Sequence, residues 1–241
     1  MKLKSPFQNK IKIYTDGADK KSMLEMAANP YVQGLTTNPS LMKKAGITNY
    51  TEFCKDILTH IKDKPISFEV FADDFKEMHR QAQIIYKWAE NVYVKIPIMN
   101  SKGESSIPLI KELSAQGIKL NVTALFTWDQ IQETVMAVKH GAPSIVSVFA
   151  GRIADSGRNP NPLMSASSDF CRTHGDHIEL LWASTREVFN IVEAEQAGCH
   201  IITAPPDIIK KINGFNKSPW DLSLDTIKTF KADSEAAGFS I

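Results

Sequence analysis

The stretch Asn91-Val-Tyr-Val-Lys-Ile-Pro97 has the pattern of a short buried strand with a lysine near its carboxyl end. Its alternation puts Val92, Val94 and Ile96 on one face and Lys95 on the other. An ammonium on the inner face of such a strand is costly unless it is paired or deprotonated, and a neutral amine can attack a carbonyl to form a Schiff base. A lysine that snorkels from an edge strand is the alternative, and the other strands decide between the two.

Seven further segments have the length and alternation of strands, and helix-forming segments separate them. The eight expected strands cover residues 10–15, 32–37, 66–72, 91–97, 119–126, 144–150, 178–183 and 200–203. This order is typical of a closed parallel (β/α)8 barrel, or TIM barrel, whose usual size of about 250 residues fits a single domain spanning residues 1–241. A doubly wound open sheet is the alternative, but it favours a turn of the form G-x-G-x-x-G after the first strand, where this chain has Asp16-Gly-Ala-Asp19.

Two segments lie outside this regular pattern. Residues 151–162 contain two Asn-Pro pairs and are expected to form an irregular loop. Residues 223–237 are expected to form an additional C-terminal helix that packs on the outside of the barrel.

The composition argues against several classes of protein. A net charge of +1 gives no general field for attracting nucleic acid or an anionic membrane. Residues 1–6 lack the apolar core of a signal peptide, and no apolar run reaches the length of a membrane span. The three cysteines lie far apart and suit reduced thiols. We therefore expect a soluble cytoplasmic protein that binds neither nucleic acid nor membrane.

Polar residues gather at the carboxyl ends of the expected strands, where barrels of this type carry their active sites. Strand parity puts Asn121 and Thr123 on one face, and Glu69 on the same face as Ser67. A structural core would carry Val or Ile there, because buried polar groups need partners. A hydroxyl bonded to the backbone is the simpler interpretation of any single Ser or Thr, but the convergence of the whole set with one lysine indicates a site. The set comprises Asp16, Thr36, Thr37, Asn38, Glu69, Lys95, Asn121, Thr123, Ser147, Arg152, Ser184 and Arg186.

These residue types suit imine chemistry without a metal or another cofactor. Lys95 would attack a ketone, and Glu69, held by Thr123, would orient the water that leaves and returns. Asp16 would move the proton of the hydroxyl beside the C–C bond that breaks. No His pair lies at ligand spacing on a strand, so we expect no metal site.

Two arginines follow strands six and seven, a place where barrels often hold phosphate. Arg152 and Arg186 can each bind an oxyanion through two parallel hydrogen bonds. Surface ion pairs are the alternative for both, and we favour the anion site.

Motifs in order from strand one to strand seven resemble those of the transaldolase family. They are Thr15-Asp-Gly17, Leu35-Thr-Thr-Asn-Pro-Ser40, Ser67-Phe-Glu-Val70, Val94-Lys-Ile-Pro97, Asn121-Val-Thr123, Ser147-Val-Phe-Ala-Gly-Arg-Ile153 and Ala183-Ser-Thr-Arg186. The resemblance implies a cofactor-free mechanism in which Lys95 forms a Schiff base with a ketose phosphate. It also implies that Asp16 acts as acid and base in cleaving the C3–C4 bond, and that Glu69 works through a water bound with Thr123.

The resemblance also implies which groups bind the substrate. Asn38, Asn121 and Ser147 would hold the dihydroxyacetone moiety, and the two arginines would hold the phosphate. The substrate-binding residues expected on this basis are Thr37, Asn38, Asn121, Ser147, Phe149, Arg152, Ser184 and Arg186. The three-carbon unit would pass from fructose 6-phosphate or sedoheptulose 7-phosphate to an aldose phosphate such as erythrose 4-phosphate, in the pentose phosphate pathway. Because short relatives form rings, a homo-oligomer is expected.

Three alternatives to this transfer reaction stay open. The family contains short fructose 6-phosphate aldolases, which release dihydroxyacetone. The length of 241 residues favours that branch, whereas Glu69 in place of Gln and Phe149 in place of Tyr favour transfer. Departures from the family pattern at Val148, Trp182 and Thr185 make a sulfonated fructose a second candidate donor. A barrel that binds sugar phosphates without catalysis is the third alternative, which the joint presence of lysine and two carboxylates disfavours.

Overall fold

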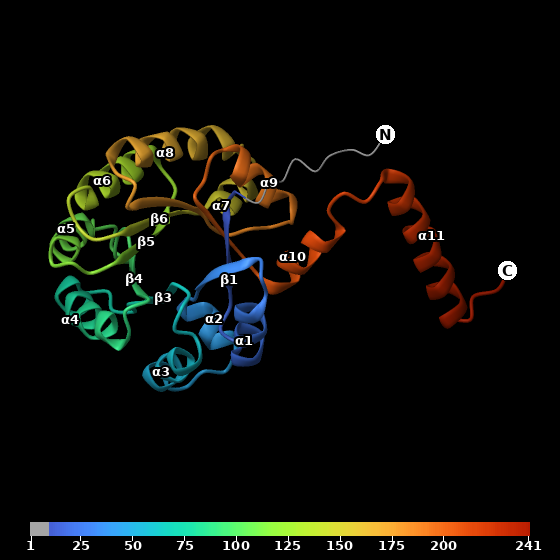
Figure 1. Ribbon diagram of the computed structural model, residues 1–241, viewed down its shortest axis with the longest axis horizontal. Coiled ribbons are helices and arrows are strands. Elements are labelled where there is room, and N and C mark those ends of the chain that lie inside the picture. Colours follow the sequence, from blue (N-terminus) through green and yellow to red (C-terminus); the bar gives the residue numbers. More distant parts are fainter. Residues whose placement is uncertain (1–9) are drawn as a thin grey trace.

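The computed structural model describes residues 10–241, so the segment 1–6, in which we expect no signal-peptide core, lies outside the described residues. The strands are β1 (Lys12–Asp16), β2 (Val32–Thr36), β3 (Ile66–Glu69), β4 (Val92–Pro97), β5 (Leu120–Leu125), β6 (Ser144–Val148), β7 (Ile178–Trp182) and β8 (Ile201–Ala204). They form a closed barrel in sequence order (Figure 1), with every pair parallel and β8 paired to β1. The predicted (β/α)8 fold class is confirmed.

The helices of residues 10–241 lie around this barrel, except for the last one (Figure 1). They are α1 (Lys20–Ala28), α2 (Pro39–Lys44), α3 (Tyr50–His60), α4 (Phe75–Ile85), α5 (Ile107–Ala115), α6 (Trp128–Val138), α7 (Ala150–Asp155), α8 (Asn161–His174), α9 (Phe189–Gln196), α10 (Pro206–Lys210) and α11 (Pro219–Ala236), with short 3-10 turns at Tyr86–Trp88 and Lys211–Gly214. Among the described residues, none of these helices combines the length and apolar character needed to cross a membrane.

Side-chain caps fix where several helices begin. Asp19 accepts a hydrogen bond from the backbone N–H of Ser22 at the start of α1. Asp74, rather than its neighbour Asp73, caps α4. At α6, Thr127 and Gln130 form a reciprocal capping box. Each cap satisfies a backbone donor that has no partner within the helix.

Two connections differ from their sequence predictions. The segment 151–162 is not wholly irregular, because α7 occupies Ala150–Asp155 and α8 begins at Asn161. The second Asn-Pro pair starts α8, since proline is tolerated in the first turn of a helix. The sequence predicts a helix over residues 184–197, but after β7 the chain forms a loop and α9 begins at Phe189. Ser184 adopts a positive φ of 67° that a helix cannot contain.

The C-terminal helix is present, but the prediction that it packs on the barrel is wrong. α11 projects away from the barrel (Figure 1), and none of its residues is buried. Trp220, Leu224 and Ile227 are separated by four and three residues and therefore share one face, where they are 78%, 42% and 60% exposed. The helix thus presents an apolar stripe that its own barrel does not cover.

A close contact between β1 and β2 fills part of the barrel interior. Tyr14 pairs in register with Gly34, and its buried ring lies directly over that glycine. A Cβ atom at Gly34 would come within 2.4 Å of a ring carbon of Tyr14. Only a residue without a side chain fits beneath the ring.

We predict that Gly34→Ala lowers the free energy of unfolding by about 1–3 kcal/mol, because the ring must move within a packed interior. Urea denaturation of the purified variant would measure the change. Gly214→Ala is the matched control, since a Cβ there meets no atom within 4 Å. Equal stability of the two variants would contradict the proposed contact.

Candidate active site

Strand register brings the expected inner-facing residues together at the carboxyl end of the barrel. Glu69 pairs with Lys95, and Lys95 with Asn121, so the three side chains point to the same side. A cavity of about 170 Å³ opens at this end. Its lining includes Asp16, Thr36, Asn38, Lys95, Asn121, Thr123, Ser147, Phe149, Arg152, Ser184, Arg186 and Thr203. Most of the predicted site residues therefore converge on one cavity.

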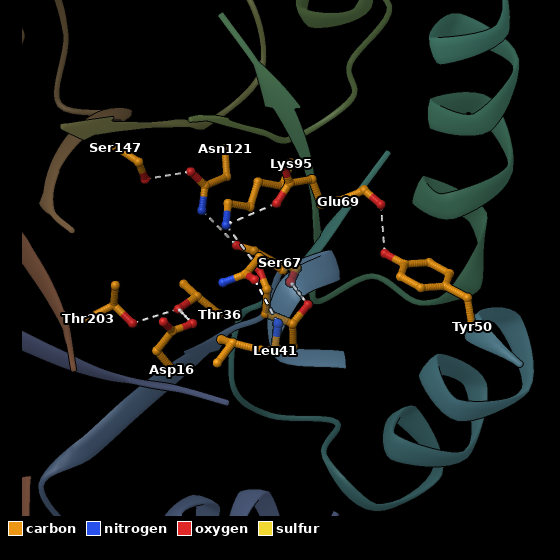
Figure 2. Close-up of polar contacts among 12 residues, drawn as sticks. Asp16, Thr36, Leu41, Tyr50, Ser67, Glu69, Lys95, Asn121, Ser147 and Thr203 are labelled. Atoms are coloured by element: carbon orange, nitrogen blue, oxygen red, sulfur yellow. Dashed lines mark hydrogen bonds and ion pairs between the residues drawn. The ribbon is translucent and has the colours of Figure 1, made fainter. Parts of the chain in front are cut away.

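The Lys95 side chain is buried within the barrel. Its Nζ atom donates to the backbone carbonyl of Thr37 at 2.9 Å and lies 3.2 Å from Oε2 of Glu69 (Figure 2). An ammonium has three N–H donors, so one remains for a group in the cavity. The snorkelling alternative is therefore wrong, and the ammonium is paired as burial requires.

The expected direct contact between Glu69 and Thr123 is not formed. The described residues give the Glu69 carboxylate an ion pair with Lys95, while the buried hydroxyl of Thr123 has no hydrogen-bond partner among them. The backbone carbonyl of Glu69 accepts a bond from the Tyr50 hydroxyl at 2.7 Å. Tyr50 thus fixes the main chain beside the carboxylate, and the Thr123 hydroxyl is available to a molecule in the cavity.

A chain of hydrogen bonds links β3, β5 and β6 across the inner wall (Figure 2). Ser147 donates to the amide oxygen of Asn121 at 2.6 Å, and the Asn121 amide nitrogen donates to Ser67 at 2.9 Å. A serine hydroxyl has one proton, so Ser147 can only accept a bond from a substrate hydroxyl. Asn121 keeps a second N–H for the cavity.

The two predicted residues after β2 are placed differently. Asn38 lines the cavity, and its amide oxygen caps α2 by accepting from the backbone N–H of Leu41, which leaves its amide nitrogen to donate to a substrate. The Thr37 hydroxyl donates to the backbone carbonyl of Ser67, and its side chain does not line the cavity. Thr37 therefore acts here through its own carbonyl, which holds Lys95.

Asp16 lies at the end of β1 and accepts a hydrogen bond from the Thr36 hydroxyl at 3.0 Å. Burial raises the pKa of its carboxyl above the ordinary value, although the charge of Lys95 and the Thr36 bond act in the opposite direction. A raised pKa makes the carboxylate a stronger base than a solvated one. Asp16 is thus a buried carboxyl that lines the cavity and binds protons more tightly than a solvated one.

The two arginines lie on one side of the cavity but have different partners. Arg152 stacks its guanidinium over the Phe149 ring, 5.1 Å from the ring centroid. Arg186 donates from Nε to the Asp155 carboxylate at 2.9 Å and pairs with it through Nη2. This ion pair lowers the pKa of Asp155. The alternative of a surface ion pair therefore applies in part to Arg186, whose Nη1 group carries no such bond to Asp155.

A close backbone approach positions this side of the cavity. A Cβ atom at Gly151 would come within 1.7 Å of the Ser184 carbonyl oxygen, so only glycine lets α7 lie against the end of β7. The bond from the Gly151 N–H to the carbonyl of Ala183 holds the two segments together. Arg152 is the next residue, and this contact fixes the start of the turn that carries it.

No metal centre is found in the described range 10–241, where no three His, Cys, Asp or Glu residues gather as possible ligands. The charged groups around the cavity are the ammonium, the guanidinium groups and the carboxylates described above. They suit the binding of an anionic, hydroxylated carbonyl compound and the transfer of protons to and from it.

The sequence profile described as Transaldolase/Fructose-6-phosphate aldolase matches residues 13–241. The chain belongs to this family. A "Probable transaldolase" of Methanococcus maripaludis strain C7 is 38% identical over 226 residues, which are 94% of this chain and 98% of that protein. A "Probable transaldolase" of Brucella anthropi is 33% identical over 231 residues, covering 96% of this chain and all of the relative. The resemblance inferred from the motifs is confirmed.

Solved structures support the fold alone. A putative lyase/mutase from Burkholderia cenocepacia J2315 superposes with a TM-score of 0.57 at 12% identity, over 85% of this chain and 79% of the other. KGPDC from Streptococcus mutans gives a TM-score of 0.55 at 12% identity, over 83% and 90%. The transaldolase/fructose-6-phosphate aldolase assignment therefore rests on the sequence relatives.

Sequence reasoning left three residues of the site without a role. The sequence places Thr36 at a strand end but does not indicate its hydrogen bond to Asp16. Thr203 ends the last expected strand on the same face as Ile201, so the parity argument could have found it. Asp155 follows Arg152 at helical spacing, but a segment expected to be irregular gives no reason to use that spacing.

We predict that Thr36→Val raises the pKa of Asp16 further, because the variant removes a hydrogen bond that stabilises the ionised carboxylate. Carbon-13 NMR titration of the Asp16 carboxyl would measure it. In the wild-type protein the midpoint should lie above the ordinary value of about 3.9. Thr36→Ser keeps the donor and should titrate like wild type. A lower midpoint in Thr36→Val than in wild type would contradict the interaction.

Proposed function

We propose that this protein is a transaldolase that moves a dihydroxyacetone unit from a ketose phosphate to an aldose phosphate through a Schiff base on Lys95. Fructose 6-phosphate and sedoheptulose 7-phosphate are the proposed donors, in the pentose phosphate pathway. The observation that carries this proposal is the buried Lys95 amine, 3.2 Å from the Glu69 carboxylate and facing the same cavity as Asp16. Family membership supports the reaction class.

Imine formation begins when Lys95 loses a proton. Glu69 is its ion-pair partner and can take that proton. The free amine then adds to the ketone carbon to give a carbinolamine, and loss of water gives the iminium. The unpaired Thr123 hydroxyl suits the binding of this water. The carboxylate would return the proton that lets the hydroxyl leave.

Cleavage follows on the side of Asp16. The carboxylate takes the proton of the C4 hydroxyl, and the C3–C4 electron pair moves into the iminium. An aldose phosphate then dissociates, and an enamine remains bound to Lys95. The acceptor aldehyde is then attacked by the enamine, and Asp16 returns the proton to the new hydroxyl. The raised pKa of Asp16 suits both directions.

The binding groups fit the two ends of the donor. Ser147 and Asn121 together offer an acceptor and a donor to the hydroxyls of the three-carbon unit. Arg152 and the free edge of Arg186 would bind the terminal anion, where Asp155 lowers the net positive charge. A sulfonate carries less negative charge than a phosphate, so this carboxylate keeps the sulfonated fructose as a second candidate donor.

We also propose that the protein assembles as a homo-oligomer through α11. Its stripe of Trp220, Leu224 and Ile227 is exposed, and a contiguous apolar surface of this kind marks an interaction site. A second copy of the same chain is the proposed partner, with the cytoplasm as the expected compartment.

The test of the reaction is borohydride reduction in the presence of fructose 6-phosphate, followed by peptide mass mapping. A reduced three-carbon adduct on Lys95 is expected, and none on the Lys95→Met variant. Asp16→Asn should lower the turnover number by about 10²–10⁴ while leaving the fold intact, because a general acid–base group is lost. A Lys95→Met variant with full turnover would rule out the mechanism.

Adding erythrose 4-phosphate separates transfer from release. A transaldolase consumes the donor only with this acceptor, whereas free dihydroxyacetone formed without it would identify a lyase. Absence of any adduct from folded protein would direct the same experiment to the sulfonated fructose. A negative result there would leave a binding protein without catalysis.

We predict that replacing Trp220, Leu224 and Ile227 together by Ser reduces the molecular mass in solution to that of one chain, about 26.9 kDa. Light scattering after gel filtration would measure it. Thr229→Ser lies on the opposite side of α11 and is the control, which should keep the wild-type mass. An unchanged oligomer in the triple variant would exclude this surface.

A further inference from the structure

A chain of two threonine hydroxyls runs from Asp16 into the last strand of the barrel (Figure 2). The Thr36 hydroxyl donates to Oδ1 of Asp16 at 3.0 Å, and the hydroxyl oxygens of Thr36 and Thr203 are 2.6 Å apart. Both threonines are buried and both line the active-site cavity. The chain therefore joins β1, β2 and β8 at the reacting end of the barrel.

The backbone holds Thr203 in this position independently of its hydroxyl. Thr203 pairs with Tyr14 where β8 meets β1, and the backbone carbonyl of Thr203 accepts a hydrogen bond from the Thr185 hydroxyl at 2.7 Å. The Thr203 side chain is thus presented to Thr36 by a fixed main chain. Its hydroxyl is not needed to join the two strands.

The number of protons in the chain determines its direction. An ionised Asp16 can only accept, so Thr36 must donate to it and Thr203 must donate to Thr36. When a neutral Asp16 carries its proton on Oδ1, it donates to Thr36, which then donates to Thr203. Thr203 can turn its proton into the cavity that it lines. Each protonation state of the carboxyl therefore has a hydrogen-bonded arrangement.

We propose that Thr203 is a positioning residue that lets Asp16 alternate between its two protonation states during C–C cleavage. This inference rests on the proposed transaldolase function and adds a residue to its machinery. As the C3–C4 bond breaks, the hydroxyl proton passes to Oδ1 of Asp16 and the electron pair enters the iminium on Lys95. The Thr36 proton then rotates from Asp16 to Thr203. On the return step both protons move back, so that no proton is gained or lost.

Thr203→Val is the decisive variant, because valine nearly keeps the shape and removes the hydroxyl. Thr36 then has no acceptor for its proton when Oδ1 of the neutral Asp16 carries the acid proton. We expect turnover of fructose 6-phosphate with erythrose 4-phosphate to fall about tenfold, as for a buried donor left without a partner. Thr203→Ser keeps the hydroxyl and should restore most of the rate.

A second readout separates positioning from a general structural defect. Dihydroxyacetone forms the imine on Lys95 without breaking a C–C bond, so its borohydride-trapped adduct should form at the wild-type rate in Thr203→Val. Wild-type turnover in this variant, an equal loss of trapping and turnover, or failure of Thr203→Ser to restore the rate would each overturn the inference. If wild-type protein forms no adduct with dihydroxyacetone, the Schiff-base function itself fails, which is a distinguishable result.

Discussion

The carboxyl end of this barrel is organised around one ammonium group inside it. A buried charge is tolerated only with a counter-charge and hydrogen bonds, and Lys95 receives both from adjacent strands. The Glu69 carboxylate comes from β3 in direct register, and the Thr37 carbonyl comes from the chain that leaves β2. The ends of three strands therefore have to meet at one point. In the closed barrel, the inward-facing side chains at the carboxyl ends of all eight strands point toward a common axis. This arrangement brings the three groups together.

The sequence was informative wherever two-residue alternation decides which way a side chain points. It located Lys95, Glu69, Asn121 and Ser147 on one inner surface, and parallel pairing in the structure puts them there. It was less informative about partners. Alternation does not show that Glu69 would pair with Lys95 rather than bond to Thr123, because that depends on distances between strands.

Segments without alternation were the hardest to predict. The two Asn-Pro pairs after α7 indicated irregular backbone and concealed the short helix that carries Asp155. The approach of Asp155 to Arg186 further depends on the segment after β7, which sequence spacing does not place. For α11, periodicity identified a helix and its apolar side, but nothing in the pattern says which surface covers that side. The sequence likewise gives no sign that residue 151 must be glycine, because this requirement comes from the Ser184 carbonyl of a distant segment.

The seam between β1 and β8 has a consequence for the order of events during synthesis. Asp16 leaves the ribosome early, while its distant hydroxyl neighbour on β8 emerges nearly two hundred residues later. Contacts so far apart in sequence are slow to form, because a long loop must close before they are made. Nascent chains can therefore carry Lys95 and Glu69 on paired strands before their acid–base group has its full surroundings. Asp16 gains its full set of neighbours only when the seam between β1 and β8 is complete.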